Sequence, residues 1–222
     1  GGTGIECERS KMLFESVNNR NGPNRIEYVN KKGAFIMPGH HEKRYRKTLY
    51  IVTSAAIAAI YVILTLPFAQ IAFGPVQFRL AECMTVLPIL MPAAIPGLTI
   101  GCFLSNLLNP NNLGPIDIIF GSLATLLAAV STRWIFVSMK RVTGIAKDWI
   151  ALLPPVILNA LIVGTYLTFL LTTGPVLGTV ILMNIGYIAL SQAVVIYLIG
   201  FPLLLLLRKS GVGKYREGTG KK

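Results

Sequence analysis

The stretch Gly74-Pro-Val-Gln-Phe-Arg-Leu-Ala-Glu-Cys-Met84 interrupts a sequence that is almost continuously apolar from residue 49 to residue 207. Within it, Arg79 and Glu82 are spaced so that their side chains share a face on a helix and can pair. Ionisable side chains at membrane depth are costly, and they usually belong to a functional site. An ion pair that anchors a helix end among lipid headgroups would explain the same residues. The stretch by itself leaves both interpretations open.

The composition of the whole chain predicts a membrane protein. Apolar residues make up 53% of the 222 residues and charged residues only 14%, which is too little polar surface for a water-soluble fold. The net charge of +12 belongs mostly to the ends: residues 1–50 carry ten Lys or Arg, residues 208–222 carry six, and the long segment between carries five. Such basic ends indicate cytoplasmic tails beside a lipid bilayer, and not nucleic-acid binding.

Proline and glycine breaks divide the apolar sequence into six predicted helices. They cover residues 49–69, 76–90, 93–108, 116–139, 149–171 and 176–207. The second and third are short for a bilayer core, which needs about 20 residues per helix. The loop at residues 140–148 is basic while the loops before and after it are uncharged, which places both ends of a six-helix chain in the cytoplasm.

We therefore predict an all-α membrane protein with six transmembrane helices and cytoplasmic termini. Three regions follow: a polar, basic tail at residues 1–47 that we expect to be disordered, a membrane domain at residues 48–207, and a basic tail at residues 208–222.

On this topology, polar side chains from five helices gather toward the outer half of one bundle. Polar residues of membrane helices usually face the bundle interior or a cavity, so the group predicts a small-molecule pocket that opens to the outside. Unrelated hydrogen bonds between helices are the alternative, which Asn159 or Asn184 alone would fit better. The predicted binding residues are Gln77, Phe78, Arg79, Glu82, Asn106, Asp117, Asn159 and Gln192.

The charges in this group indicate what kind of ligand it suits. Two carboxylates and one guanidinium leave a surplus negative charge, which favours a cationic ligand with several N–H donors. A guanine-like edge offers adjacent N–H groups that can donate hydrogen bonds to a carboxylate. Asn and Gln amides suit an edge that carries both donors and acceptors. Phe78 can stack on a planar ring.

Catalytic motifs are missing from the sequence. There is no GxxxxGK[ST] phosphate-binding loop, no HExxH and no GxSxG, and both histidines lie outside the apolar segment. Cys7, Cys83 and Cys102 include no CxxC pair, so they predict neither a disulfide framework nor a zinc site. We therefore expect that the chain is not an enzyme, that it has no ATPase site of its own, and that it binds no metal or cofactor.

Small residues recur at a spacing of four in the first predicted helix, where Ser54 precedes Ala58 and Ala55 precedes Ala59. Gly97-x-x-x-Gly101 gives the third predicted helix a similar face. In lipid, such faces let two helices approach closely. The strip on the first helix could meet a helix of the same chain or a separate subunit, and the sequence leaves both open.

Four segments occur together in one order: Gly74 to Glu82 of the opening stretch, Met91-Pro-Ala-Ala-Ile-Pro-Gly97, Pro115-Ile-Asp-Ile-Ile-Phe-Gly-Ser-Leu-Ala-Thr125 and Leu158-Asn-Ala-Leu-Ile-Val-Gly164. This combination closely resembles the QueT family. Its members are the substrate-binding (S) components of energy-coupling factor (ECF) transporters for queuosine precursors. The resemblance covers about residues 48–207, the whole predicted membrane domain.

The resemblance implies a six-helix S component in a bacterial plasma membrane that captures a 7-deazaguanine base, such as the aminomethyl or nitrile form, outside the cell. It implies three partner subunits, namely a transmembrane coupling protein and two cytoplasmic ATPases. The family's small-residue strip, matched here by Ala55 and Ala59 with Ser54 and Ala58 beside them, would meet the coupling protein. An S component for another vitamin, a stand-alone small-molecule permease and a structural membrane protein are the alternative hypotheses.

Overall fold

The computed structural model describes residues 28–29, 35–36, 39–68, 78–109, 113–171 and 177–211, with side chains from residue 44 onward. The chain divides into two units, Gly1–Tyr50 and Ile51–Lys222. In the first unit, strands β1 (Tyr28–Val29) and β2 (Phe35–Ile36) pair antiparallel, and helix α1 (Gly39–Thr65) begins. This helix starts inside the segment that we predicted as a polar tail, and most of that tail lies outside the described residues.

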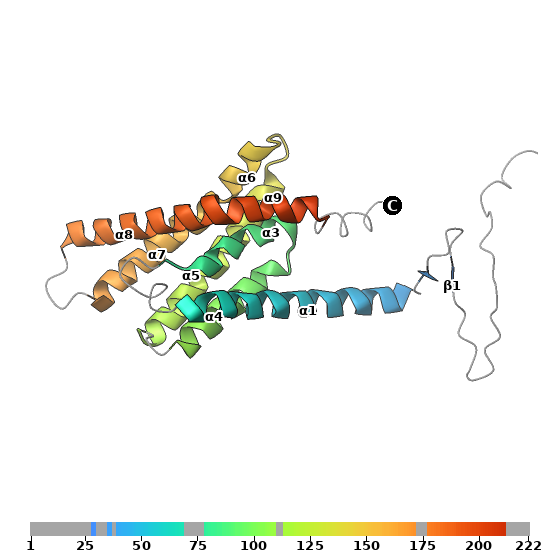
Figure 1. Cartoon of the computed structure of the whole chain (residues 1–222), viewed down its shortest axis with the longest axis horizontal. Helices are drawn as coiled ribbons and strands as arrows, with labels where there is room; N and C mark the ends of the chain where they lie inside the picture. Colours follow the sequence, from blue (N-terminus) through green and yellow to red (C-terminus); the bar gives the residue numbers. More distant parts are fainter. Residues whose placement is uncertain are drawn as a thin grey trace, which may run out of the picture. The chain divides into compact units, whose positions relative to one another are not determined.

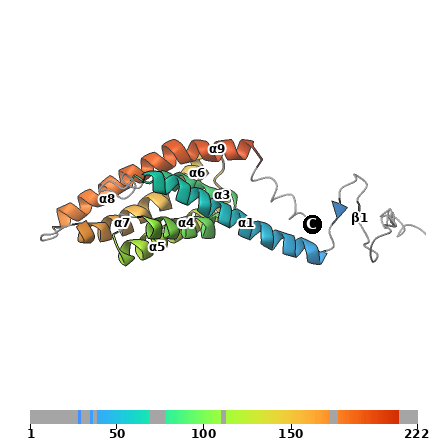
Figure 2. The ribbon, with the colours of Figure 1, turned by 60° about the horizontal axis from the view of Figure 1, so that its bottom comes forward.

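The described part of the second unit consists of helices, which Figures 1 and 2 show from two directions. In chain order they are the end of α1, η1 (Leu66–Phe68), η2 (Leu80–Val86), α3 (Leu87–Leu90), α4 (Ala94–Leu108), α5 (Pro115–Ser138), α6 (Ile145–Ala151), α7 (Leu153–Leu171), α8 (Gly178–Ala193), η3 (Val194–Gly200) and α9 (Phe201–Lys209).

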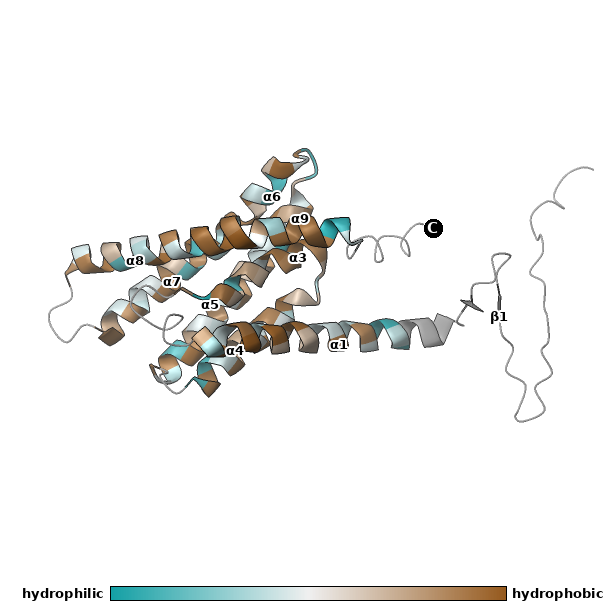
Figure 3. Ribbon diagram, viewed as in Figure 1, coloured by the Kyte–Doolittle hydropathy of each residue, from teal (hydrophilic) through white to brown (hydrophobic). Residues whose placement is uncertain are grey.

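Four helical segments among the described residues are long and apolar enough to cross a membrane: Arg44–Phe68, Pro115–Ser138, Ile145–Leu171 and Gly178–Lys209. Two shorter apolar segments, Leu80–Leu90 and Ala94–Leu108, lie where the second and third spans were predicted. Figure 3 shows apolar residues along α9 and hydrophilic residues at its end. The prediction of an all-α, multi-pass membrane protein is thus confirmed for the second unit.

Helix ends gather at the two ends of the second unit. The end of α4, the start of α5, the end of α7 and the start of α8 lie at one end, to the left in Figure 1, whereas α6 and the end of α9 lie at the other. α7 and α8 pack along each other. A Cβ at Gly164 of α7 would lie 2.9 Å from the Cα of Ile185 in α8, so only glycine allows this approach.

Two irregular helices pack against each other in the same unit. η2 is a 3-10 helix, η3 is a π-helix, and a Cβ at Gly200 of η3 would lie 2.8 Å from the Cys83 carbonyl oxygen of η2. The π-helix ends two residues before Pro202, which lacks the N–H that ordinary helical bonding needs. In a 3-10 helix the residues at i and i+3 lie directly above one another. Thr85 therefore lies over Glu82, and its hydroxyl donates to the Glu82 carbonyl oxygen at 2.6 Å. The sequence predicted a helix over this stretch but not its 3-10 form.

α1 and α4 approach closely through small residues. A Cβ at Gly97 would lie 2.8 Å from the Ser54 carbonyl oxygen, and one at Gly101 would lie 2.7 Å from the Cβ of Tyr61. The Ser54 hydroxyl also donates to the Ala93 carbonyl oxygen at 2.8 Å. The predicted close-packing face of Gly97 and Gly101 is therefore confirmed, and its partner is α1.

We expect Gly101→Ala to lower the thermal unfolding temperature of the purified chain in detergent. The added methyl group meets the Tyr61 Cβ and the Ala58 carbonyl oxygen, so the α1–α4 contact must open at a cost of about 1–3 kcal/mol. Gly186→Ala is the matched control, because a Cβ there meets nothing within 4 Å. Equal losses in the two variants would contradict the packing argument.

Candidate functional site

Glu82 lies in the middle of a buried chain of hydrogen bonds. Its side chain is 2% exposed, and each carboxylate oxygen has a donor: the Tyr61 hydroxyl donates to Oε1 at 2.6 Å, and Asn159 Nδ2 donates to Oε2 at 3.3 Å. Asn159 Nδ2 also donates to Gln192 Oε1 at 3.5 Å. We call these four residues the Glu82 group. It links α1, η2, α7 and α8 inside the bundle.

A second buried group surrounds Asp117 at the start of α5. Arg79 Nη2 lies 3.8 Å from Asp117 Oδ1, and the Tyr166 hydroxyl donates to the same oxygen at 2.6 Å. Asn106 Nδ2 donates to the Asp117 backbone carbonyl oxygen at 3.2 Å, and Arg79 Nη1 contacts the Cys102 sulfur at 3.7 Å. We call Arg79, Asn106, Asp117 and Tyr166 the Asp117 group. It connects α4, α5 and α7 with the residue that precedes η2.

Two acceptor atoms in the Asp117 group receive no hydrogen bond from the part of the chain that the structure describes: Asp117 Oδ2 and Asn106 Oδ1. Both side chains are fully buried. The Asn106 side-chain amide contacts the Asp117 backbone carbonyl oxygen. A carbonyl oxygen can only accept a hydrogen bond, so the NH₂ of Asn106 must face it and Oδ1 must point away. A buried acceptor without a donor costs on the order of 1–3 kcal/mol, so these two atoms require an explanation.

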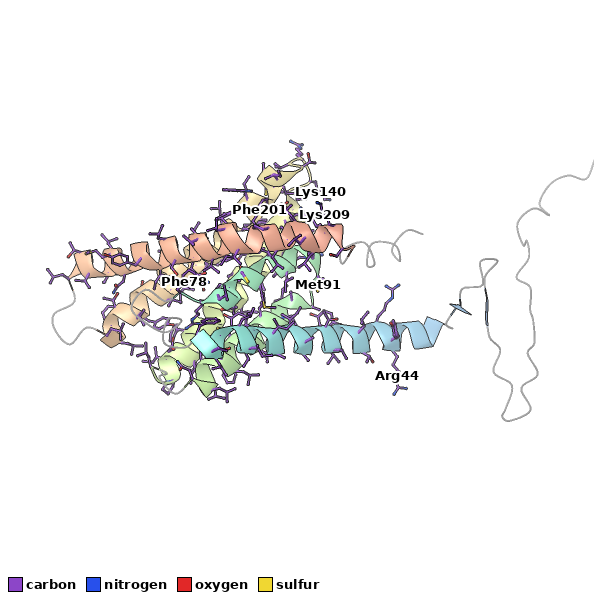
Figure 4. All side chains as sticks on the ribbon, in the orientation of Figure 1. Arg44, Phe78, Met91, Lys140, Phe201 and Lys209 are labelled. Carbon is purple, nitrogen blue, oxygen red and sulfur yellow. The ribbon has the colours of Figure 1, made fainter. Side chains whose placement is uncertain are left out.

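The structure brings six of the predicted binding residues into the two groups: Arg79, Glu82, Asn106, Asp117, Asn159 and Gln192. Phe78 is half-buried, packs against the apolar core, and lies toward the end of the unit where α1 ends (Figure 4). Gln77 lies outside the described residues. Asn184 donates to the Thr168 hydroxyl at 2.8 Å, an ordinary inter-helix hydrogen bond. A ligand-binding role for these residues stays a prediction.

Sequence reasoning missed Tyr61 of the Glu82 group, Tyr166 of the Asp117 group, and Cys102, which contacts Arg79. A helical face carries a residue at i, i+4 and i+7, and this spacing places Tyr61 on the face of Ser54 and Ala58. Tyr166 follows Asn159 by the same seven positions. The signal was therefore present in the spacing, but a tyrosine in a membrane helix more often marks the lipid interface.

The small-residue strip of α1 divides into two rows. Ser54 and Ala58 are buried, and their carbonyl oxygens face Gly97 and Gly101 of α4. Ala55 and Ala59 are exposed. Ser54 and Ala58 thus pack within this chain, and the surface open to another subunit is the row of Ala55 and Ala59.

Comparison with known proteins gives a consistent result. A family model described as QueT transporter matches residues 51–209. The queuosine precursor transporter QueT of Lactococcus lactis subsp. cremoris (strain MG1363) is 41% identical over 83 residues. That alignment covers 36% of this chain and 47% of the relative, so it spans about half of the relative's length. No solved structure matches the chain.

We expect Tyr61→Phe to lower the thermal unfolding temperature in detergent, because Glu82 Oε1 loses its hydroxyl donor while it stays buried. Removing one partner of a buried hydrogen bond costs about 1–3 kcal/mol. Tyr197→Phe is the matched control, since that hydroxyl donates to the Trp149 carbonyl oxygen at an exposed position and its loss leaves no buried carboxylate without a donor. If both variants unfold at the wild-type temperature, the Tyr61–Glu82 hydrogen bond does not hold the bundle together.

Proposed function

This chain belongs to the QueT transporter family, and we propose that it is the substrate-capturing S component of an ECF-type importer. Its ligand is a queuosine precursor, a 7-deazaguanine base such as the aminomethyl or nitrile form, taken from outside the cell. The observation that carries the proposal is the buried cluster of the Glu82 and Asp117 groups inside an apolar bundle. Ionisable residues are costly inside a membrane and are retained where they serve a ligand or a pathway.

The charge and hydrogen-bonding character of the cluster supports a nitrogen-rich ligand. Two carboxylates and one guanidinium leave an acceptor-rich site. Carboxylate and amide oxygens accept from N–H groups, which a deazaguanine presents along one edge. The aminomethyl form adds a cation that matches the surplus negative charge, whereas the nitrile form binds through its ring edge alone.

The proposed topology has six spans with both termini in the cytoplasm. The two short apolar segments, Leu80–Leu90 and Ala94–Leu108, serve as the second and third spans, tilted or locally matched to the bilayer. Figure 4 places Lys140 and Lys209 at the same end of the unit, and the α5–α6 loop there carries Arg141. Because basic residues favour the cytoplasmic side, this end is the cytoplasmic one and the Asp117 end is the outer one.

Energy for transport comes from other subunits in this proposal. The sequence holds no phosphate-binding loop, so the chain acts with a transmembrane coupling protein and two cytoplasmic ATPases and is not itself an enzyme. Ala55 and Ala59 form the docking face, since their small side chains are exposed on α1 and permit close helix contact in lipid.

We expect the purified chain alone, in detergent, to bind 7-aminomethyl-7-deazaguanine or 7-cyano-7-deazaguanine more tightly than guanine or riboflavin. An S component carries its ligand site within one chain, so calorimetric titration needs no partner subunit. Selective binding of riboflavin or another vitamin would move the assignment to a different S component. Binding of none of these compounds would overturn the proposed function.

We expect the double variant Ala55→Leu, Ala59→Leu to bind the base normally. Cells that express this variant together with the coupling protein and both ATPases should no longer take up the base. The larger side chains hold the partner helix away and lie outside the two polar groups. Gly186→Leu is the control, because this glycine is exposed on α8 and has open space around it. Uptake by the double variant at the level of the control would show that the row only faces lipid, and uptake without ATPases would indicate a stand-alone permease.

A further inference from the structure

The two carboxylates of the cluster differ in how fully their oxygens are used. Both oxygens of Glu82 accept hydrogen bonds, from Tyr61 and from Asn159. Asp117 accepts from Tyr166 and approaches Arg79 through Oδ1, while its Oδ2 has no donor within the described residues. Glu82 is therefore satisfied by the protein, and Asp117 offers an oxygen to something else.

A second unused acceptor belongs to a residue that touches Asp117. Asn106 Nδ2 donates to the Asp117 carbonyl oxygen at 3.2 Å, and Asn106 Oδ1 has no donor among the described residues. Both residues are fully buried, so bulk water does not satisfy these atoms. Two acceptors on contacting residues are suited to two neighbouring N–H donors.

The surrounding side chains fix how these acceptors are presented. Tyr166 and Arg79 both lie on the Oδ1 side of Asp117, so the carboxylate cannot turn without losing a hydrogen bond. Gly121 lies on the same side: a Cβ there would lie 2.8 Å from Asn106 Nδ2, 3.5 Å from the Tyr166 hydroxyl oxygen and 3.8 Å from Asp117 Oδ1. The missing side chain at Gly121 thus lets the Asn106 amide lie against α5.

We infer that Asp117 Oδ2 and Asn106 Oδ1 receive the ring N–H and the exocyclic amine of the ligand's guanine-type edge. Glu82 is a positioning residue that holds α1 and α7 in place without touching the ligand. This inference rests on the proposed function, because it names the part of a deazaguanine that the site reads. It also predicts that recognition depends on the exocyclic amine, since a site built for a donor discriminates strongly against an analogue that lacks it.

The test combines two pairs of ligands with two carboxylate-to-amide variants of the full chain in detergent. The probes are 7-aminomethyl-7-deazaguanine and 7-cyano-7-deazaguanine, each compared with the same base lacking its 2-amino group. The variants are Asp117→Asn and Glu82→Gln. In Asp117→Asn the Tyr166 hydroxyl retains the amide oxygen, so the NH₂ turns toward the ligand donor and repels it. The measured quantity is the dissociation constant of the analogue that lacks the 2-amino group, divided by that of the complete base.

For the wild-type chain we expect this ratio to be about tenfold or more, the size of a good base-edge contact. The ratio should fall toward one in Asp117→Asn. In Glu82→Gln both bases should bind more weakly, with the ratio preserved. Should Asp117→Asn fail to fold by its thermal unfolding profile, Asn106→Ala gives a second measurement, and its ratio should fall as well.

Three results would overturn the inference. A wild-type ratio near one would mean that the 2-amino group makes no hydrogen bond to the protein and that ordered water donates to Asp117 Oδ2 and Asn106 Oδ1. A ratio that survives in Asp117→Asn but falls in Glu82→Gln would transfer the contact to Glu82. A loss in Asp117→Asn that is confined to the aminomethyl base would place the ammonium, and not the ring edge, at Asp117. Failure of the wild-type chain to bind any of the bases rejects the proposed function itself.

Discussion

The buried carboxylate of Glu82 is the constraint on which the arrangement of the bundle depends. A group of this kind is tolerated away from water only when its oxygens have donors, and here the donors come from α1 and α7. Asn159 extends the chain to Gln192 of α8. Because these residues are far apart in sequence, satisfying one carboxylate fixes several helices relative to one another. The requirement explains why a polar residue can organise a protein that is apolar almost everywhere else.

Close backbone packing makes that arrangement possible. Lipid tails are as apolar as the helix surfaces, so helices in a membrane associate through fit and hydrogen bonding. Gly97 and Gly101 bring α4 against α1, Gly164 brings α7 against α8, and Gly200 brings η3 against η2. The first of these contacts uses Ser54 and Ala58, which leaves Ala55 and Ala59 as the outward row. One helix therefore has one small-residue face that packs within its own chain and another that is exposed.

The two polar groups show how similar side chains acquire different tasks from their surroundings. Glu82 and Asp117 are both buried carboxylates that accept from a tyrosine hydroxyl. The remaining oxygen of Glu82 faces an amide donor, and that of Asp117 faces none within the described residues. A satisfied carboxylate contributes to the structure, whereas an unsatisfied one carries an energetic cost that a ligand donor can offset. The difference lies in the neighbours and not in the residue type.

The sequence alone determined the membrane character and the family, because lipid imposes long apolar helices and the motifs around Arg79 and Asp117 are local. It also identified most polar members of the candidate site, since polar residues stand out in an apolar sequence. Only the tertiary structure decided that Arg79 reaches Asp117, that Tyr61 and Tyr166 are the hydroxyl donors, and which acceptor oxygens have no donor among the described residues. These facts depend on side chains from different helices meeting at hydrogen-bond distance, and no spacing along one helix contains that information.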